Sequence, residues 1–371
     1  MMFTFAPHTR MRQSPYFAAT VAAGVTMFLS YNKMLLPASY GAPEEEYWRL
    51  IHGVSQWDVA AQRQVQLQGP DAARLAQILT PRDLSTAQAG QGKYVALCDH
   101  RGVIINDPIL LKLDDDRYWL SIADSDMLYW ARAIAAERGL RVAVSEPDVS
   151  PLAVQGPKAG EVIAAVLGEW TRDIKHFHFH KTAVAGIPLL LARSGWSRQG
   201  GFELYLMDGK KGVALWNIIN EAGQPWDIGP GTPNACERIE SGLLSWGGDT
   251  DDDTNPFEIR LEKFIDLTAP DEVVGIAALR QIHAAGVARH QLGVILEGDT
   301  PAASNTVWLD LRQNGKKVGD MTNGIWSPRL QKNIGFALIS RTCAVGDRVE
   351  VVKENGAIPA QLVALPFVAP S

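Results

Sequence analysis

Two acidic residues stand in sequence surroundings that suit chemistry, and the first of them is Glu203. Gly200 and Gly201 precede it and an alternating apolar run follows it, so we expect a tight turn leading into a strand. A carboxylate held near the start of a strand can accept two parallel N–H donors from a flat heterocycle such as a pterin. An ordinary hairpin with a solvated glutamate is the alternative that this segment leaves open.

Asp107 is the second candidate, and it lies within the apolar run of residues 102–111. Burying a charge without a partner is costly, so a carboxylate inside such a strand indicates a function. The Asp107-Pro108 pair also fits a bulge in an edge strand, because proline cannot donate to a ladder. The local sequence does not decide between these two interpretations.

No metal site is predicted from the sequence. His176, His178 and His180 alternate with phenylalanines, which predicts three imidazoles on one side of a strand at residues 177–182. No Cys, His or carboxylate set at ligand spacing accompanies them, so a polar strand face is favoured over a metal site. The acidic run 249–254 resembles the start of a calcium loop but has Thr254 where the loop needs glycine, so an acidic connecting loop is predicted.

The composition is that of a soluble globular protein with two or three domains. Of 371 residues, 46% are hydrophobic and 20% charged, and a net charge of −6 without a basic run argues against nucleic-acid and membrane partners. Three cysteines, far apart and odd in number, indicate a reduced compartment without a disulfide framework. The apolar stretch 16–30 is too short to span a bilayer, so we expect a short buried helix at residues 16–23 of a cytoplasmic protein.

The first two thirds of the chain contain an internal sequence repeat, the Gly-Pro echo. The segments 65–72 and 152–159 both read as a strand that ends at Gly-Pro, with a helix opening behind it. Two such units predict two related α+β halves, each an antiparallel sheet covered by helices on one face. From about Val273 the chain breaks into short strands separated by Gly, Asn and Pro, which predicts a small β-rich barrel or sandwich.

Taken together, these segments resemble the folate-dependent aminomethyltransferase family, whose type member is the T-protein of the glycine cleavage system. The matching segments follow the family's order along the chain: Trp57-Asp58, Gly69-Pro70-Asp71-Ala72, Gly92-Lys93-Tyr94, Gly102-Val103-Ile104-Ile105-Asn106-Asp107, Gln155-Gly156-Pro157-Lys158-Ala159, Gly200-Gly201-Phe202-Glu203, Arg238-Ile239-Glu240-Ser241-Gly242, Thr254-Asn255-Pro256 and Ser327-Pro328-Arg329-Leu330-Gln331-Lys332-Asn333-Ile334. Each segment alone is weak evidence, but the set in this order is highly specific.

Within the family, the chain most resembles the dimethylsulfoniopropionate demethylases. The segments that resemble this branch rather than the T-protein are Arg12-Gln13-Ser14-Pro15, Tyr31-Asn32-Lys33-Met34, Pro81-Arg82-Asp83-Leu84, Asn106-Asp107-Pro108, Ala123-Asp124-Ser125-Asp126, Gly195-Trp196-Ser197 and Leu261-Glu262-Lys263-Phe264. Two residues depart from that branch: Lys33 stands where a histidine is expected, and His178 where a bulky aromatic residue is expected near the methyl donor. These departures leave open which donor the protein uses.

The resemblance implies an α+β fold in a three-domain ring around a central folate cavity. Residues 1–55 plus 146–265 are expected to form one α+β domain, residues 56–145 the second, and residues 273–371 a β-rich, barrel-like domain. It also implies roles for individual residues. The expected catalytic residue is Asp107; the expected folate-binding residues are Glu203, Trp196, Tyr94 and Arg238; and the expected donor-binding residues are Arg12, Tyr31, Lys33 and His178.

The implied function is methyl transfer from a small sulfonium donor to tetrahydrofolate, with no metal. Such a transfer is an in-line displacement with a good leaving group, so it needs positioning more than a strong base. Aminomethyl transfer of the T-protein type and folate binding without catalysis are the alternatives. The expected partners are tetrahydrofolate and the donor, with no nucleic acid or membrane; the sequence is compatible with a homodimer but does not indicate one.

Overall fold

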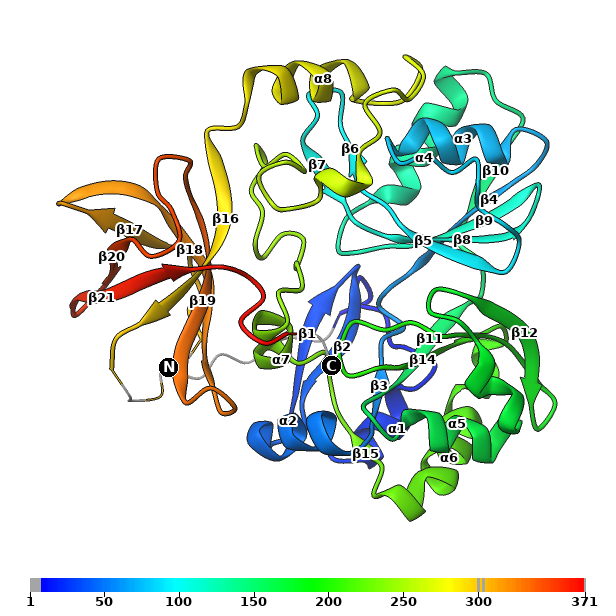
Figure 1. Ribbon diagram of the computed structural model, residues 1–371. Coiled ribbons are helices and arrows are strands. Elements are labelled where there is room, and N and C mark those ends of the chain that lie inside the picture. Colours follow the sequence, from blue (N-terminus) through cyan, green and yellow to red (C-terminus); the bar gives the residue numbers. More distant parts are fainter. Residues whose placement is uncertain (1–7, 299–300, 302–303, 370–371) are drawn as a thin grey trace.

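The computed structural model describes residues 8–298, 301 and 304–369, which form three bodies arranged around a centre (Figure 1). The first two bodies each contain one sheet and its helices, and the third is a barrel at the left of the view. This arrangement confirms the expected combination of two α+β parts and a β-rich C-terminal part. Within the described residues, no helix combines the length and apolar character that crossing a membrane requires.

The first sheet has six strands in the order β12-β13-β14-β11-β3-β15, antiparallel except for the last pair. The strands are β3 (Ser55–Asp58), β11 (Ser150–Gln155), β12 (Phe179–Val184), β13 (Ile187–Ala192), β14 (Gly201–Leu206) and β15 (Gly229–Pro230). Helices α5 (Ala159–Leu167) and α6 (Gly212–Gly223) cover one face of this sheet, and α1 (Phe17–Ala22) packs against α6. The expected domain boundary between residues 55 and 56 runs through β3, and the division into domains remains a prediction.

The second sheet has five antiparallel strands in the order β10-β4-β9-β8-β5. The strands are β4 (Gln64–Gln68), β5 (Gln91–Tyr94), β8 (Ile109–Asp114), β9 (Arg117–Ser121) and β10 (Ala143–Ser145). Helices α3 (Ala72–Leu79) and α4 (Met127–Glu137) pack on one face and complete an apolar core there. Helices thus cover one face of each sheet, as the sequence predicted.

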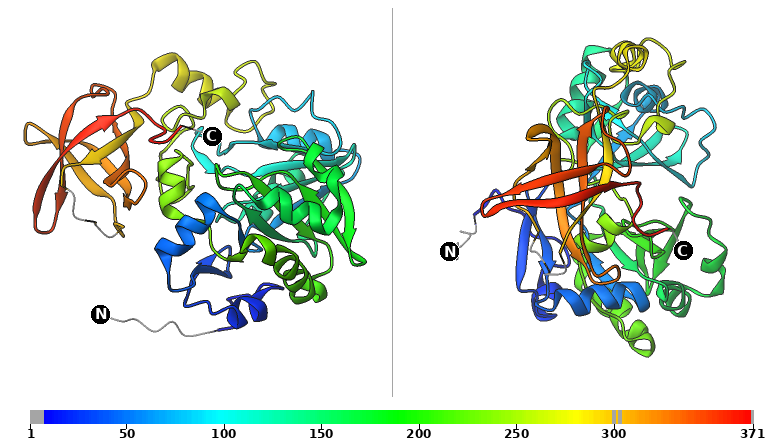
Figure 2. Two further views of the ribbon diagram at one scale, coloured as in Figure 1. Left: turned by 60° about the horizontal axis from the view of Figure 1, so that its bottom comes forward. Right: turned by 60° about the vertical axis from the view of Figure 1, so that its left-hand side comes forward.

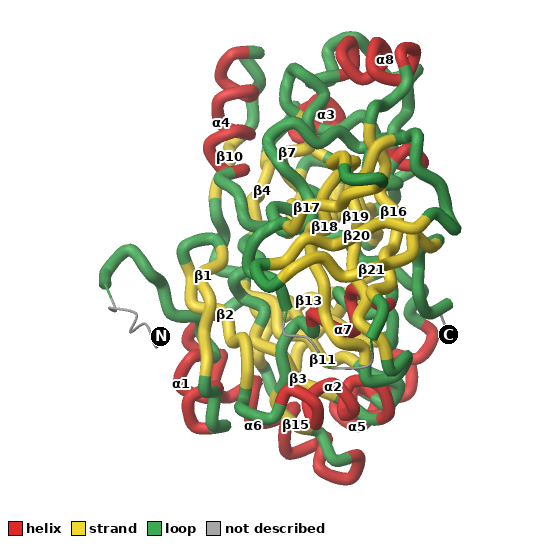
Figure 3. The backbone as a smooth tube through the Cα atoms, turned by 90° about the vertical axis from the view of Figure 1, so that its left-hand side faces the viewer, coloured by secondary structure: helices red, strands yellow, loops and turns green. Residues whose placement is uncertain are grey.

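The uncovered faces of the two sheets pack against each other. A buried apolar cluster joins Leu111 and Trp119 of the second sheet to Phe179, Leu190 and Tyr205 of the first. The helices therefore form the two outer layers and the sheets the two inner layers, an order visible in Figure 3, where helices lie at the two ends of the molecule. A polar side chain near the centre of these inner faces, such as that of Glu203, therefore lies between the two sheets, away from bulk water.

The Gly-Pro echo occupies the same place in both halves. Gly69 follows β4 and Gly156 follows β11, with φ angles of +137° and +121° that favour glycine. A Cβ atom would lie 2.5 Å from the carbonyl oxygen of Arg141 at Gly69, and 2.5 Å from that of Gly53 at Gly156. Each glycine therefore lets the chain turn closely past a neighbouring backbone before the next helix begins, which confirms the predicted repeat.

The C-terminal part is a closed barrel in the order β16-β19-β18-β17-β20-β21. Its strands are β16 (Arg289–Leu296), β17 (Leu309–Gln313), β18 (Lys316–Ser327), β19 (Lys332–Ser340), β20 (Arg348–Lys353) and β21 (Gly356–Val363). Figure 2 shows that the barrel stands beside the two sheets, with α7 (Ala235–Glu240) between it and the first body. The Glu240 carboxylate on α7 accepts hydrogen bonds from Tyr47 on one side and from Ser327 and Arg329 of the barrel on the other.

Several elements differ from those that the sequence predicted. The hairpin of β1 (Met27–Tyr31) and β2 (Met34–Ser39), helix α2 (Pro43–His52), helix α8 (Ile276–Ala285) and strand β21 were not predicted. The apolar run around Asp107, expected to form a single strand, forms two strands instead, β7 (Ile104–Asn106), which pairs with β6 (Leu97–Cys98), and β8. The break falls at Asp107-Pro108. Helix α7 (Ala235–Glu240) is short, because Gly242 follows with a φ angle of +70°.

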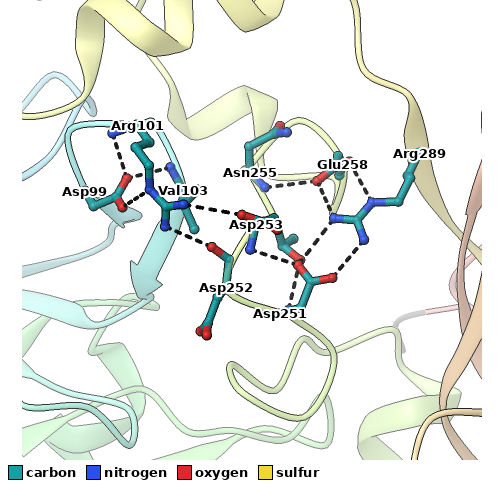
Figure 4. Close-up of polar contacts among 10 residues, drawn as sticks. Asp99, Arg101, Val103, Asp251, Asp252, Asp253, Asn255, Glu258 and Arg289 are labelled. Carbon is teal, nitrogen blue, oxygen red and sulfur yellow. Dashed lines mark hydrogen bonds and ion pairs between the residues drawn. The ribbon is translucent and has the colours of Figure 1, made fainter.

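The acidic loop 249–254 is a junction of ion pairs (Figure 4). Arg289, at the start of β16, reaches Asp251 at 2.8 Å and Glu258 at 3.0 Å. Burial works against the charge of Asp251, but the Arg289 guanidinium outweighs it and lowers the pKa of Asp251 to about 2. On the other side of the loop, Arg101 pairs with Asp99 at 2.9 Å and with Asp253 at 3.3 Å, so the loop connects the second body to the barrel.

Candidate active site

A cavity of about 220 Å³ lies where the two halves and the segment after α7 meet. Its walls combine two carboxylates with aromatic rings, and no Lys, Arg or His is among the described residues that line it. The carboxylates are Asp107 and Glu203, and the aromatic residues are Tyr31, Tyr94, Phe177, Trp196, Tyr205 and Trp246. A cavity with negative groups and aromatic faces suits a cationic or N–H-rich ligand.

The break between β7 and β8 brings Asp107 to the cavity. Asn106 is fully buried, and its amide donates to the Ala123 carbonyl at 3.1 Å and accepts from the Ala123 N–H at 3.0 Å. This pair of bonds anchors the end of β7, and Pro108 cannot continue the ladder. Asp107 stands between these two residues, and its Oδ2 accepts a hydrogen bond from the Tyr94 hydroxyl at 2.9 Å.

The proton affinity of Asp107 is far from that of an ordinary carboxylate. Burial raises its pKa from 3.8 to about 7, with a further contribution from the negative charge of Asp249, although the bond from Tyr94 acts in the opposite direction. Asp107 can therefore hold or release a proton near neutral pH. Burial together with the charge of Asp107 raises the pKa of Tyr31 and of Tyr94, so both phenols remain protonated hydrogen-bond donors.

Glu203 lies inside β14, on the face that packs against the other sheet. Its side chain is only 5% exposed, so the alternative of a solvated hairpin glutamate is wrong. Its neighbours across the ladder are Ala153 and Ala192, whose small side chains leave space above the carboxylate. Oε2 accepts hydrogen bonds from the Ser194 hydroxyl and, at 3.3 Å, from Tyr205. No described residue bonds Oε1, and burial raises the Glu203 pKa.

Trp196 lies on a loop that is held from both sides. On one side, the Gln155 amide donates to the Ser194 carbonyl at 3.1 Å and accepts from Ser197 at 2.8 Å. On the other, the Glu237 carboxylate of α7 accepts the Arg198 backbone N–H at 3.1 Å. The loop therefore fixes the indole against the cavity, which is a suitable wall for a flat ligand.

Arg238 is not among the described residues that line the cavity, and its expected role in folate binding remains a prediction. Its side chain pairs with the buried carboxylate of Asp249 at 2.8 Å. Its guanidinium carbon lies 5.8 Å from the centre of the Trp196 ring and 5.5 Å from that of Phe336. Arg238 thus supports the wall from behind, because the nearest buried acid holds it there.

Among the four expected donor-binding residues, the structure places only Tyr31 in this cavity. Arg12 and Lys33 line a separate, neighbouring cavity. The histidines do not share one face of a strand, because β12 begins only at Phe179 and Phe177 has a φ angle of +58°. His178 lies 3.2 Å from the Gln91 amide and outside the cavity lining.

Three aromatic lining residues escaped the sequence analysis: Phe177, Tyr205 and Trp246. Tyr205 carried a usable signal, because residues two apart on a strand share a face and Glu203 lies two positions before it. Phe177, one residue before the position where an aromatic side chain was expected, lines the cavity from a backbone with a φ angle of +58°. Trp246 comes from a loop far along the chain, for which no local pattern exists. Among residues 8–298, 301 and 304–369, no group of three or more His, Cys, Asp or Glu is arranged to hold a metal.

Comparison with known proteins gives consistent relatives over nearly the whole chain. The GCVT N-terminal domain matches residues 16–269 and the glycine cleavage T-protein C-terminal barrel domain matches residues 289–369. The chain is 41% identical to the dimethylsulfoniopropionate demethylase DmdA of Ruegeria pomeroyi, over 96% of this chain and 98% of the relative. It is 28% identical to an aminomethyltransferase of Thermotoga maritima, over 95% of this chain and 96% of the relative.

The fold has a close counterpart among solved structures. The glycine cleavage system aminomethyltransferase T from Bartonella henselae superposes with a TM-score of 0.84 at 22% identity, covering 97% of this chain and 98% of that one. Both parts of the T-protein architecture, the two-sheet body and the barrel, are therefore present in order. The chain belongs to the glycine cleavage T-protein family.

Proposed function

We propose that the protein is a tetrahydrofolate-dependent demethylase that transfers a methyl group from dimethylsulfoniopropionate, or a close sulfonium analogue, to tetrahydrofolate. The observation that carries the proposal is a cavity with two carboxylates, six aromatic rings and no cationic residue in its described lining. A sulfonium group is stabilised by aromatic faces and negative charge. The 41% identity to a protein named dimethylsulfoniopropionate demethylase supports the same donor class.

Glu203 is the proposed anchor for the pterin ring. Ser194 and Tyr205 occupy Oε2, which leaves Oε1 free to accept an N–H donor from the ligand. The carboxylate projects from a continuous strand, β14, into the space between the two sheets, so its position is set before the ligand arrives. Preorganisation of this kind lowers the ordering cost of binding.

Asp107 is the proposed catalytic residue. In the reaction, the N5 lone pair of tetrahydrofolate attacks the methyl carbon, the sulfur–methyl bond breaks, and a neutral thioether leaves. N5 then loses its proton, and a carboxylate with a pKa of about 7 can accept it near neutral pH. Before transfer, the same carboxylate balances the donor's positive charge, with Tyr31, Tyr94 and Trp196 as walls.

The test is a product assay on the purified protein. We expect 5-methyltetrahydrofolate, detected by mass spectrometry, when tetrahydrofolate is supplied with dimethylsulfoniopropionate. Betaine and O-methyl donors serve as comparison substrates. A 5,10-methylene product from an amine donor would instead show aminomethyl transfer, the activity in the name of the 28%-identical relative. Tight folate binding without turnover on any donor would identify a binding protein.

We also propose that the protein acts in the cytoplasm. Its three cysteines are free and buried, which fits a compartment where thiols stay reduced.

A further inference from the structure

A second cavity, of about 270 Å³, lies directly behind the first. Ile122 lines both cavities. Three short segments contribute to both as well, with Tyr31, Gln62 and Ala123 facing the first cavity and Lys33, Arg63 and Ser125 facing the second. The two spaces are therefore separated by a single layer of chain.

The second cavity has more positive than negative groups. Four cationic side chains line it: Arg10, Arg12, Lys33 and Arg63. Two carboxylates are paired with them, since Glu146 binds both Arg12 and Arg63, and Asp126 binds Lys33 at 2.8 Å. Four cations against two carboxylates leave a surplus of two positive charges. Asp124 lies close by, but its Oδ1 accepts the Asn32 backbone N–H at 2.6 Å, and counting it still leaves a surplus of one.

Two of the arginines have unused hydrogen-bond donors. The Nη2 atom of Arg12 is buried and has no hydrogen-bond partner among the described residues. Arg10 is exposed, and its side chain has no hydrogen bond or ion pair within the described part of the chain, so it is available to a ligand; its backbone N–H bonds His8 at 3.1 Å. A buried N–H without a partner is costly, and buried donors in native proteins are almost always satisfied.

The ion-pair junction in Figure 4 shows how other arginines of this molecule are paired. There Arg289 has two carboxylates to itself, and Arg101 has two carboxylates and the Asp252 carbonyl. In the second cavity, by contrast, Arg12 and Arg63 share one carboxylate and Arg10 has none. In a chain with a net charge of −6, such a local surplus is conspicuous.

We propose that the second cavity binds a small oxyanion, a carboxylate or phosphate group, separately from the methyl-transfer cavity. The guanidinium groups of Arg10 and Arg12 are the ligand's main partners, since arginine matches the geometry of both kinds of oxyanion. Thr9 adds a hydroxyl to the lining, whereas the Ser125 hydroxyl already donates to the Ile105 carbonyl at 2.9 Å, and Tyr129 is 61% exposed. The proposal does not depend on the proposed function, because it concerns a different cavity.

Calorimetry on the full chain tests this site, with inorganic phosphate and propionate as separate probes. We expect one binding event for at least one probe, and the stronger of the two identifies the class of anion. Arg10→Ala should weaken it about tenfold, the loss expected when one charge-assisted contact is removed. Arg12→Lys, which keeps the charge but removes the fork of donors, should weaken it by a similar factor.

The matched control is Arg348→Ala, which removes an equally positive and exposed side chain from the barrel. This variant should bind the anion as the unchanged protein does. Circular dichroism and tetrahydrofolate binding on every variant separate loss of the site from loss of the fold. No binding of either probe to the unchanged protein, or equal weakening by Arg348→Ala, would overturn the proposal.

Discussion

Asp107 and Glu203 reach one cavity from two related halves of the chain, but the two halves hold them differently. Glu203 lies within a continuous strand, opposite two alanines, and two hydroxyl groups bond one of its oxygens. Asp107 lies at a break between two strands, beside a proline, and receives a single side-chain hydrogen bond, from Tyr94. Burial raises the pKa of both, to about 7 for Asp107.

This difference separates two tasks that carboxylates perform in enzymes. A carboxylate inside an uninterrupted ladder has a fixed direction, which suits recognition of a flat ligand. A carboxylate with fewer internal hydrogen bonds and a pKa near neutrality suits proton transfer. Under the proposed function, this contrast favours ligand binding at the six-stranded sheet that holds Glu203 and chemistry beside the five-stranded sheet at Asp107, and each of the following substitutions tests one of these two proposed roles.

The largest expected effect is at Asp107. Asp107→Asn should lower kcat and kcat/KM together by roughly 10²-fold, the scale of removing one preorganised electrostatic contact. Tetrahydrofolate affinity should stay close to that of the unchanged protein. Steady-state kinetics with the true donor give the first result and calorimetry the second. Asp115→Asn, at an almost fully exposed side chain nearby, is the control; a folded Asp107→Asn protein with normal turnover would remove Asp107 from the mechanism.

At Glu203 we expect the reverse, a large effect on tetrahydrofolate affinity and a small effect on turnover. Glu203→Gln should weaken tetrahydrofolate binding tenfold or more, since a charge-assisted hydrogen bond contributes about 1.5–3 kcal/mol. Turnover at saturating tetrahydrofolate should fall much less. Calorimetry measures the affinity, and Glu221→Gln, on the helix that covers the outer face of the same sheet, is the matched control. Unchanged affinity would mean that the pterin is bound elsewhere.

The pH dependence should show the titration of Asp107. Because burial raises its pKa from 3.8 to about 7, the reactive carboxylate forms as the pH rises through about 7. We expect kcat/KM to increase with pH up to that region and then level off, with a slope of at most about tenfold per pH unit. Asp107→Asn should remove this acidic limb from its residual activity. If the limb persists, another group such as Glu203 causes it.

The smallest expected effect concerns the support of Glu203. Ser194→Ala removes one hydrogen bond to Oε2 and should weaken tetrahydrofolate binding about fivefold, corresponding to about 1 kcal/mol. The kcat value should not change, because Ser194 is not among the residues that line the cavity. Ser340→Ala, on an exposed end of β19, is the comparison. A loss as large as that of Glu203→Gln would show that Ser194 itself contacts the ligand.

The sequence was sufficient for the features that depend on local rules. The Gly-Pro repeat revealed the two halves because only glycine fits where Gly69 and Gly156 pass a neighbouring backbone. Asp107 drew attention because it interrupts an apolar run, and Glu203 because it follows a glycine turn at the start of an alternating strand. Resemblance to a family then placed Tyr94, Trp196 and Tyr31, and all three line the cavity.

The sequence was less informative where a side chain's direction depends on distant contacts. Arg238 turns toward Asp249, and Arg12 toward Glu146, so neither faces the first cavity. At position 177 the backbone is left-handed, and Phe177 rather than His178 lines the cavity. A sequence pattern locates a residue along the chain, but ion-pair partners from other segments decide which wall the residue faces.

Through helix α7 the barrel supports the ligand-binding cavity, although none of the described barrel residues lines that cavity. Glu237 and Glu240 lie almost one helical turn apart and are both buried, but Glu237 bonds the Trp196 loop whereas Glu240 bonds Arg329 of the barrel. A fragment without the barrel would lose the Arg329 partner of Glu240 and the apolar contacts of Ile239 with Ile334 and Phe336. Helix α7, which holds the Trp196 loop through Glu237, would then lack its support on that side. The barrel therefore stabilises a wall of the cavity from a distance, and we expect the cavity to form fully only in the whole chain.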